Sequence, residues 1–123
     1  MKFLTKTCGV LALAAGMLEA ADKPLLQQPP SKEFNRSNPY ATKPSAEQAG
    51  LKLFERECSS CHGRQAQGTK RAPALSSPVL NHVPPGAIFW ILRNGSLRRG
   101  MPSFSHLPEP QRWQIVTYLK SLQ

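Results

Sequence analysis

The 123-residue chain has few acidic residues and lacks the side-chain sets on which most enzymes rely. Only 7 Asp and Glu stand against 16 Lys and Arg, so the formal net charge is +9. This excess favours anionic partners, although it bears on association and solubility rather than on fold. The sequence offers no Ser/His/Asp set, phosphate-binding loop or carboxylate pair that suggests catalysis. We therefore expect that the chain is not itself an enzyme.

The sequence also lacks an apolar run long enough to cross a bilayer, which takes about 20 residues. Its N-terminal run covers residues 8–18, follows Lys2 and Lys6, and is followed by the small residues Ala20 and Ala21. This order is typical of a secretory signal peptide. We predict that residues 1–21 are a cleaved signal and that the mature protein reaches the periplasm. An uncleaved anchor is the alternative.

Cysteine is scarce, and its placement is informative. Loss of residues 1–21 leaves 14 basic and 6 acidic residues, a net charge of +8, and only Cys58 and Cys61 as cysteines. Cys58-Ser59-Ser60-Cys61-His62 has the CxxCH pattern of covalent haem attachment. Two thiols at this spacing can add to the two vinyl groups on one porphyrin edge, and the next residue, His62, can then bind the iron.

Three other interpretations of the cysteine pair are a redox-active CxxC, a zinc site and a plain disulfide. A redox-active pair is typical of a βαβ setting, and the sequence shows no strand alternation. A zinc site needs further ligands, for which His82 and His106 are the remaining histidines. A disulfide would leave His62 without a role. Export, small size and the CxxCH pattern together favour haem attachment.

The sixth ligand of the iron is expected from Met101, the one methionine left after residues 1–21 are removed. It lies in a glycine- and proline-containing loop, outside any apolar period, where packing does not call for a methionine. Its thioether is a soft ligand, and His/Met ligation raises the reduction potential. His82 and His106 are the rival ligands.

Residues 45–58 are predicted to form the first helix of the domain. Ser45 and Gln48 have the form of a capping box at its start. Gly50 and Phe54 lie on one face, one turn apart, so a second helix can cross closely at the glycine.

Two further helices are predicted. One lies between Pro84-Pro85 and Asn94-Gly95. The other covers residues 108–122, with the inward stripe Ile115, Tyr118, Leu119 and Leu122. Roughly 80 ordered residues make a marginal core, so the haem would act as a staple.

Residues 22–44 contain five prolines and no period of 2 or 3.6. We predict a mobile leader that ends where the domain begins, at Ser45. Its two aromatic residues, Phe34 and Tyr40, either dock on the domain or a partner, or belong to a plain tether.

Residues 45–123 resemble class I cytochromes c, because four motifs occur in the order found in that family. They are Ala49–Phe54 with Cys58–Gly63, Ala72-Pro73-Ala74-Leu75, Leu92–Gly95 with Gly100-Met101-Pro102, and Ile115–Leu119. The resemblance implies an all-α fold of three main helices around one covalently bound haem c. It implies that Gly50 and Phe54 cross Ile115 and Tyr118.

The same resemblance implies the site. Cys58 and Cys61 would attach the haem, and His62 and Met101 would be the axial ligands of its iron. The carbonyl of Pro73 would accept a hydrogen bond from the second ring nitrogen of His62.

The function predicted from these residues is transfer of single electrons between a redox donor and an acceptor. The alternative is the cytochrome subunit of an envelope dehydrogenase, of the quinoprotein alcohol dehydrogenase type, or of an oxidase complex. Arg98 and Arg99, beside Met101, are candidates for docking on an acidic partner surface. We expect no nucleic-acid partner and no membrane span after processing.

Overall fold

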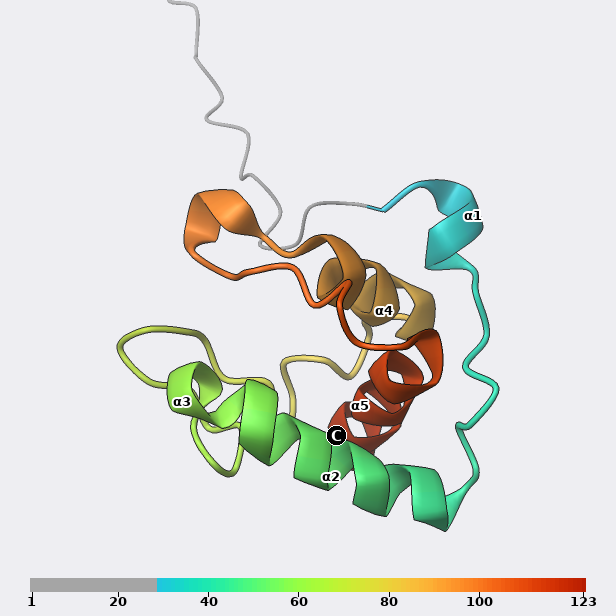
Figure 1. Cartoon of the computed structure of the whole chain (residues 1–123), viewed down its shortest axis with the longest axis horizontal. Helices are drawn as coiled ribbons and strands as arrows, with labels where there is room; N and C mark the ends of the chain where they lie inside the picture. Colours follow the sequence, from blue (N-terminus) through green and yellow to red (C-terminus); the bar gives the residue numbers. More distant parts are fainter. Residues whose placement is uncertain (1–28) are drawn as a thin grey trace, which may run out of the picture.

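The computed structural model describes residues 29–123, so the predicted signal and residues 22–28 lie outside the described residues. The helices, shown in Figure 1, are α1 Ser31–Phe34, α2 Pro44–Glu57, α3 Ser59–His62, α4 Pro85–Asn94, η1 Leu97–Arg99 and α5 Glu109–Ser121. Within residues 29–123 the sole β-type pairing is an isolated bridge between Ser96 and Met101. The predicted all-α class with three main helices, α2, α4 and α5, is confirmed.

The start of α2 differs from the prediction. Pro44 is its first residue and Lys43 precedes it, with no side-chain cap hydrogen bond. Ser45 therefore lies inside the first turn, and the predicted capping box is wrong. Proline suits a first helical position, because its φ is preset and its missing N–H has no partner there.

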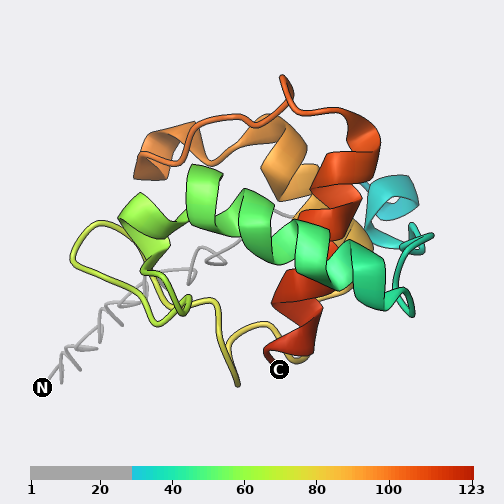
Figure 2. The same cartoon turned by 60° about the horizontal axis from the view of Figure 1, so that its bottom comes forward.

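Helices α2 and α5 cross in contact at Gly50, as predicted. A Cβ atom on Gly50 would lie 2.6 Å from the carbonyl carbon of Gln114 and 2.9 Å from Cβ of Tyr118, so no other residue fits. Phe54, one turn further on, is fully buried, and its ring centroid lies 5.4 Å from that of Tyr118. Figure 2 shows the two helices crossing at the centre of the molecule.

Helix α4 has the predicted bounds and packs against α5. Its apolar residues 87–92 are buried or half-buried, so the helix lies largely inside the core. Phe89 stacks on Trp113 of α5, with ring centroids 4.0 Å apart and an interplanar angle of 16°. Stacked aromatic pairs add to the stabilisation from buried area.

The described part of the expected mobile leader packs on the domain instead. We call residues 30–43 the N-terminal strap; it includes α1, which lies beside α4 in Figure 1. The side-chain amide Nδ2 of Asn38 donates to Oγ1 of Thr117 at 2.9 Å, and Tyr40 is half-buried against the core. The expectation of a tether therefore fails over residues 30–43.

Arg36 joins the strap to α4 and α5 through both ring contacts and hydrogen bonds. Its guanidinium lies 4.6 Å from the ring centroid of Phe89 and 5.3 Å from that of Trp113. It also donates to Glu33 at 3.3 Å and to Glu109 at 2.5 Å. The hydrogen bond from Arg36 lowers the pKa of the Glu109 carboxyl.

We predict that acid loosens the strap. Because the pKa of Glu109 is lowered in the folded protein, its bond to Arg36 is fully present above the ordinary carboxyl range and is lost as pH falls through the lowered value. Hydrogen exchange of the amides of residues 31–37, corrected for intrinsic rates, should therefore speed up on acidification.

Glu109→Gln should speed this exchange at neutral pH and remove its extra acid dependence. Glu47→Gln, at an exposed carboxylate in the first turn of α2, is the matched control and should behave as the wild type. Equal exchange in Glu109→Gln and the wild type would contradict the prediction.

Candidate haem-binding site

The CxxCH residues form one continuous turn at the end of α2. The amide of Cys58 donates to the carbonyl of Phe54 at 2.8 Å, and the amides of Cys61 and His62 donate to the carbonyl of Cys58 at 3.2 and 3.0 Å. Residues at i, i+3 and i+4 of a helix share a face. The two thiols and the imidazole are therefore grouped on one side of α3.

Both cysteines are free thiols, so the disulfide alternative does not describe this structure. Cys58 is buried, and desolvation raises the pKa of its thiol to about 12. A redox-active CxxC needs a lowered cysteine pKa, because the thiolate is the reacting form. The buried environment of Cys58 therefore argues against a redox-active pair.

His62 is buried, and its ring is oriented by one hydrogen bond. Nδ1 lies 2.8 Å from the carbonyl oxygen of Pro73. Because a carbonyl can only accept, Nδ1 carries the proton and donates it, and Nε2 keeps its lone pair. A histidine that binds metal through one nitrogen commonly has the other held in this way. This is the contact that the family resemblance implied for Pro73.

The loop of residues 63–76 brings Pro73 back to His62. The amide of Gly68 donates to the carbonyl of His62 at 2.8 Å, and the Thr69 hydroxyl donates to the carbonyl of Cys61 at 2.5 Å. Gly68 has φ +85°, and a Cβ there would lie 2.6 Å from the amide nitrogen of Ala74. The role of Thr69 was not predicted, because a single threonine in a loop carries no periodic signal.

Met101 lies at the base of a tight loop. The backbones of Ser96 and Met101 exchange two hydrogen bonds of 3.0 and 3.2 Å, and η1 forms the tip between them. The Met101 side chain is half-buried against the hydrophobic core. The loop therefore holds a thioether at the edge of the apolar interior rather than in solvent.

The two rival ligands are in different surroundings. His82 is exposed, and the side chain of His106 is 61% exposed with its Nε2 3.8 Å from a carboxylate oxygen of Glu57. Among residues 29–123 no group of three His, Cys, Asp or Glu side chains could hold a metal ion. This argues against the zinc alternative.

The donor set fits a covalently attached haem. It offers two unpaired thiols and an imidazole on one helix face, with the free Nε2 lone pair of a buried histidine and a half-buried thioether elsewhere in the fold. These features define the class of c-type cytochromes, in which the bound iron takes up and releases one electron between its ferric and ferrous states.

Comparisons with known proteins agree. Residues 45–119 match the family model described as cytochrome c oxidase, cbb3-type, subunit III, and the chain belongs to this family of c-type cytochrome domains. A search of curated proteins found no match.

The fold is similar to that of cytochrome cL from the marine methylotrophic bacterium Methylophaga aminisulfidivorans. The TM-score is 0.61 and the sequence identity 27%, over 78% of this chain and 70% of that chain. Covalently bound haem c and electron transfer are thus properties of this protein. Over residues 29–123, no helix combines the length and apolar character that a bilayer crossing requires.

Proposed function

We propose that Cys58 and Cys61 attach one haem c, that His62 and Met101 are its axial ligands, and that the protein is an exported one-electron carrier. The observation that carries this assignment is the hydrogen bond from Nδ1 of His62 to the carbonyl of Pro73. It fixes the tautomer whose Nε2 can bind iron, directly beside the two cysteines.

The roles of the residues follow from their surroundings. Each thiol would add its S–H across one vinyl group, forming a thioether without any oxidant. The hydrogen bond to Pro73 and the burial of His62 would keep the imidazole oriented. Met101 would supply a soft, neutral sulfur, which favours the ferrous state and raises the reduction potential.

A second candidate is a subunit of a larger envelope complex, either an oxidase or a dehydrogenase. The description of the matching family as an oxidase subunit is compatible with the oxidase form of this alternative. Purification under native conditions separates the two. A free monomer supports the carrier, and co-elution with a catalytic subunit supports the complex. In both cases we propose that the chain works in the periplasm, after cleavage behind Ala20 or Ala21.

We predict that the mature protein has the mass of the processed chain plus one haem, resistant to acid-acetone extraction. Cys58→Ala or Cys61→Ala should cut the yield of haem-containing protein sharply, because each removes a thioether. Cys8→Ser is the control, since Cys8 is absent from the mature chain and its loss should not change the mature mass. Intact-mass spectrometry that detected only apoprotein or a zinc adduct would refute the assignment.

We predict that Met101→Ala abolishes the weak near-infrared band of the sulfur–iron bond, lowers the reduction potential and increases affinity for carbon monoxide. Met101→Leu, which keeps an apolar side chain of similar size, should do the same, because sulfur rather than packing is what is lost. His82→Gln should retain the band. A band that survived in Met101→Ala would exclude this methionine as the ligand.

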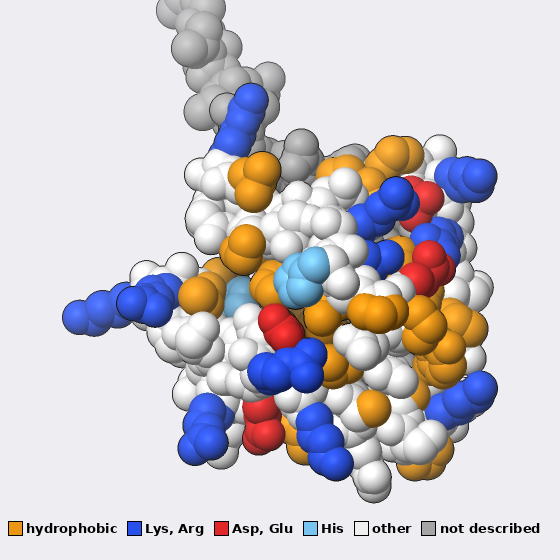
Figure 3. Space-filling view, in the orientation of Figure 1, with side chains coloured by type: hydrophobic (Ala, Val, Ile, Leu, Met, Phe, Trp, Pro, Cys, Tyr) orange, Lys and Arg blue, Asp and Glu red, His pale blue; other side chains and the backbone are white. Residues whose placement is uncertain are grey.

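The turn beside Met101 has the character of a docking surface. Leu97 is 74% exposed, and Arg98 and Arg99 follow it in η1. The loop of residues 63–76 carries the exposed Arg64, Lys70 and Arg71. Figure 3 shows basic side chains on several sides of this face and few acidic ones. An acidic partner surface with an apolar contact for Leu97 would complement them.

We predict that electron transfer with the physiological partner slows as ionic strength rises, because screening weakens electrostatic steering. Reversing Arg98 and Arg99 to Glu should flatten this dependence. The double reversal of Lys32 and Lys43, two exposed lysines of the strap, changes the charge equally and is the control. If the strap reversal flattens the dependence and the η1 reversal does not, then the strap steers the encounter.

A further inference from the structure

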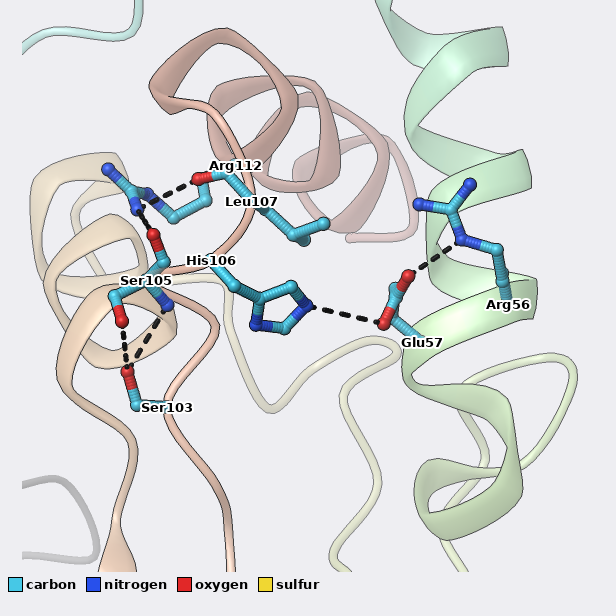
Figure 4. A network of polar contacts seen from close by, with 7 residues as sticks. All are labelled: Arg56, Glu57, Ser103, Ser105, His106, Leu107 and Arg112. Atoms are coloured by element: carbon cyan, nitrogen blue, oxygen red, sulfur yellow. Dashed lines mark hydrogen bonds and ion pairs between the residues drawn. The ribbon is translucent and has the colours of Figure 1, made fainter.

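The turn of residues 103–107, which follows Met101, is held by polar contacts from α4, α5 and α2. Figure 4 shows the contacts to α5 and α2. On the α4 side, the Ser103 hydroxyl donates to the carbonyl of Arg93 at 2.5 Å. The amide of Ser105 then donates to the Ser103 hydroxyl at 3.2 Å, which closes the turn on itself.

On the α5 side, the contact is made by a buried cation. Arg112 is 7% exposed, and its Nη1 donates to the carbonyls of Ser105 at 3.2 Å and Leu107 at 3.0 Å. Its Nε has no hydrogen-bond partner among the described residues. Burying a guanidinium is costly unless it is hydrogen-bonded. An apolar side chain could pack over Phe89 without the cost of burying a charge. The two hydrogen bonds to backbone carbonyls are therefore a contact that only a donor such as arginine can make.

On the α2 side, the contact is between a histidine and a carboxylate. His106, between the two residues whose carbonyls Arg112 binds, has Nε2 3.8 Å from Oε2 of Glu57. Nε of Arg56 donates to the other oxygen of Glu57 at 2.6 Å. Glu57 is the last residue of α2, directly before Cys58. The pair therefore joins the loop of the expected sixth ligand to the helix that leads into the attachment site.

We propose that Ser103, Arg112 and the His106–Glu57 pair are positioning residues that keep the Met101 loop closed. This rests on the proposed ligation by Met101. Met101 itself is only half-buried and its own backbone bonds are confined to Ser96, whereas Phe104 and Leu107 further along are buried in the core. The part of the loop around Met101 therefore has few buried contacts of its own, and such segments open locally at little cost. Contacts that lie outside the loop oppose this opening, which would release the thioether.

The test measures release of Met101 separately from unfolding. In the haem-containing protein, the sulfur–iron band and carbon monoxide affinity report the ligand, and far-ultraviolet circular dichroism reports the fold. Glu57→Gln should raise carbon monoxide affinity about two- to fivefold, as expected for one partly exposed polar contact. Arg112→Met should raise it about tenfold or more, because the buried carbonyl of Leu107 and the part-buried carbonyl of Ser105 lose their donor.

In both variants, the band should disappear at a lower temperature than the helical signal does. Arg112→Lys, which keeps a donor, should recover part of the effect. Glu55→Gln, at an exposed carboxylate in the same turn of α2, is the matched control and should leave both readouts unchanged. If Arg112→Met does not fold, Glu57→Gln and Ser103→Ala decide the question.

Two results would overturn the proposal, and they distinguish failure of the ligation by Met101 from failure of the positioning role. If the wild-type protein has no sulfur–iron band, then Met101 is not the ligand, and the proposed ligation fails together with this inference. If the wild type has the band, but Glu57→Gln and Ser103→Ala both match the Glu55→Gln control, then the ligation stands and the positioning role is wrong.

Discussion

The close crossing of α2 and α5 at Gly50 is the constraint on which the rest of the structure depends. Without a Cβ at this position, the α2 backbone lies against Gln114 and Tyr118 of α5, and Phe54 fills the space beside them. The crossing holds α2 against α5, and α2 leads directly into the CxxCH turn at Cys58. It also fixes α5, which presents Arg112 to the loop after Met101.

The site combines apolar burial with very few polar contacts, and each contact has a chemical consequence. The carbonyl of Pro73 selects the histidine tautomer, because an acceptor at Nδ1 leaves the lone pair on Nε2. Burial raises the pKa of the Cys58 thiol, which opposes thiolate chemistry. Among residues 29–123 the fold therefore does not favour the redox-active pair or the zinc site that two cysteines could otherwise form.

Polar contacts outside the apolar core extend the domain beyond the part that matches the family. The strap precedes residue 45, where the family match begins, yet Arg36 stacks on the Phe89–Trp113 pair and Asn38 bonds to Thr117. These contacts join segments more than 50 residues apart. Arg112 is used in a similar way, as a cation over the Phe89 ring that also binds backbone carbonyls. In both cases an arginine provides packing and hydrogen bonds together.

What the sequence by itself determined is local: CxxCH spacing, helix bounds marked by proline and glycine, and the glycine that permits a close crossing. Such features follow from backbone geometry within a few residues, so Cys58, Cys61 and His62 could be predicted as the haem-attachment motif, and α4 could be located, without a structure. The tertiary structure alone decided the contacts between distant polar groups: the strap at Arg36, the Thr69 bond, and the His106–Glu57 and Arg112 ties. No periodicity marks these residues, because a hydrogen bond depends on where two chain segments meet and not on their order in sequence.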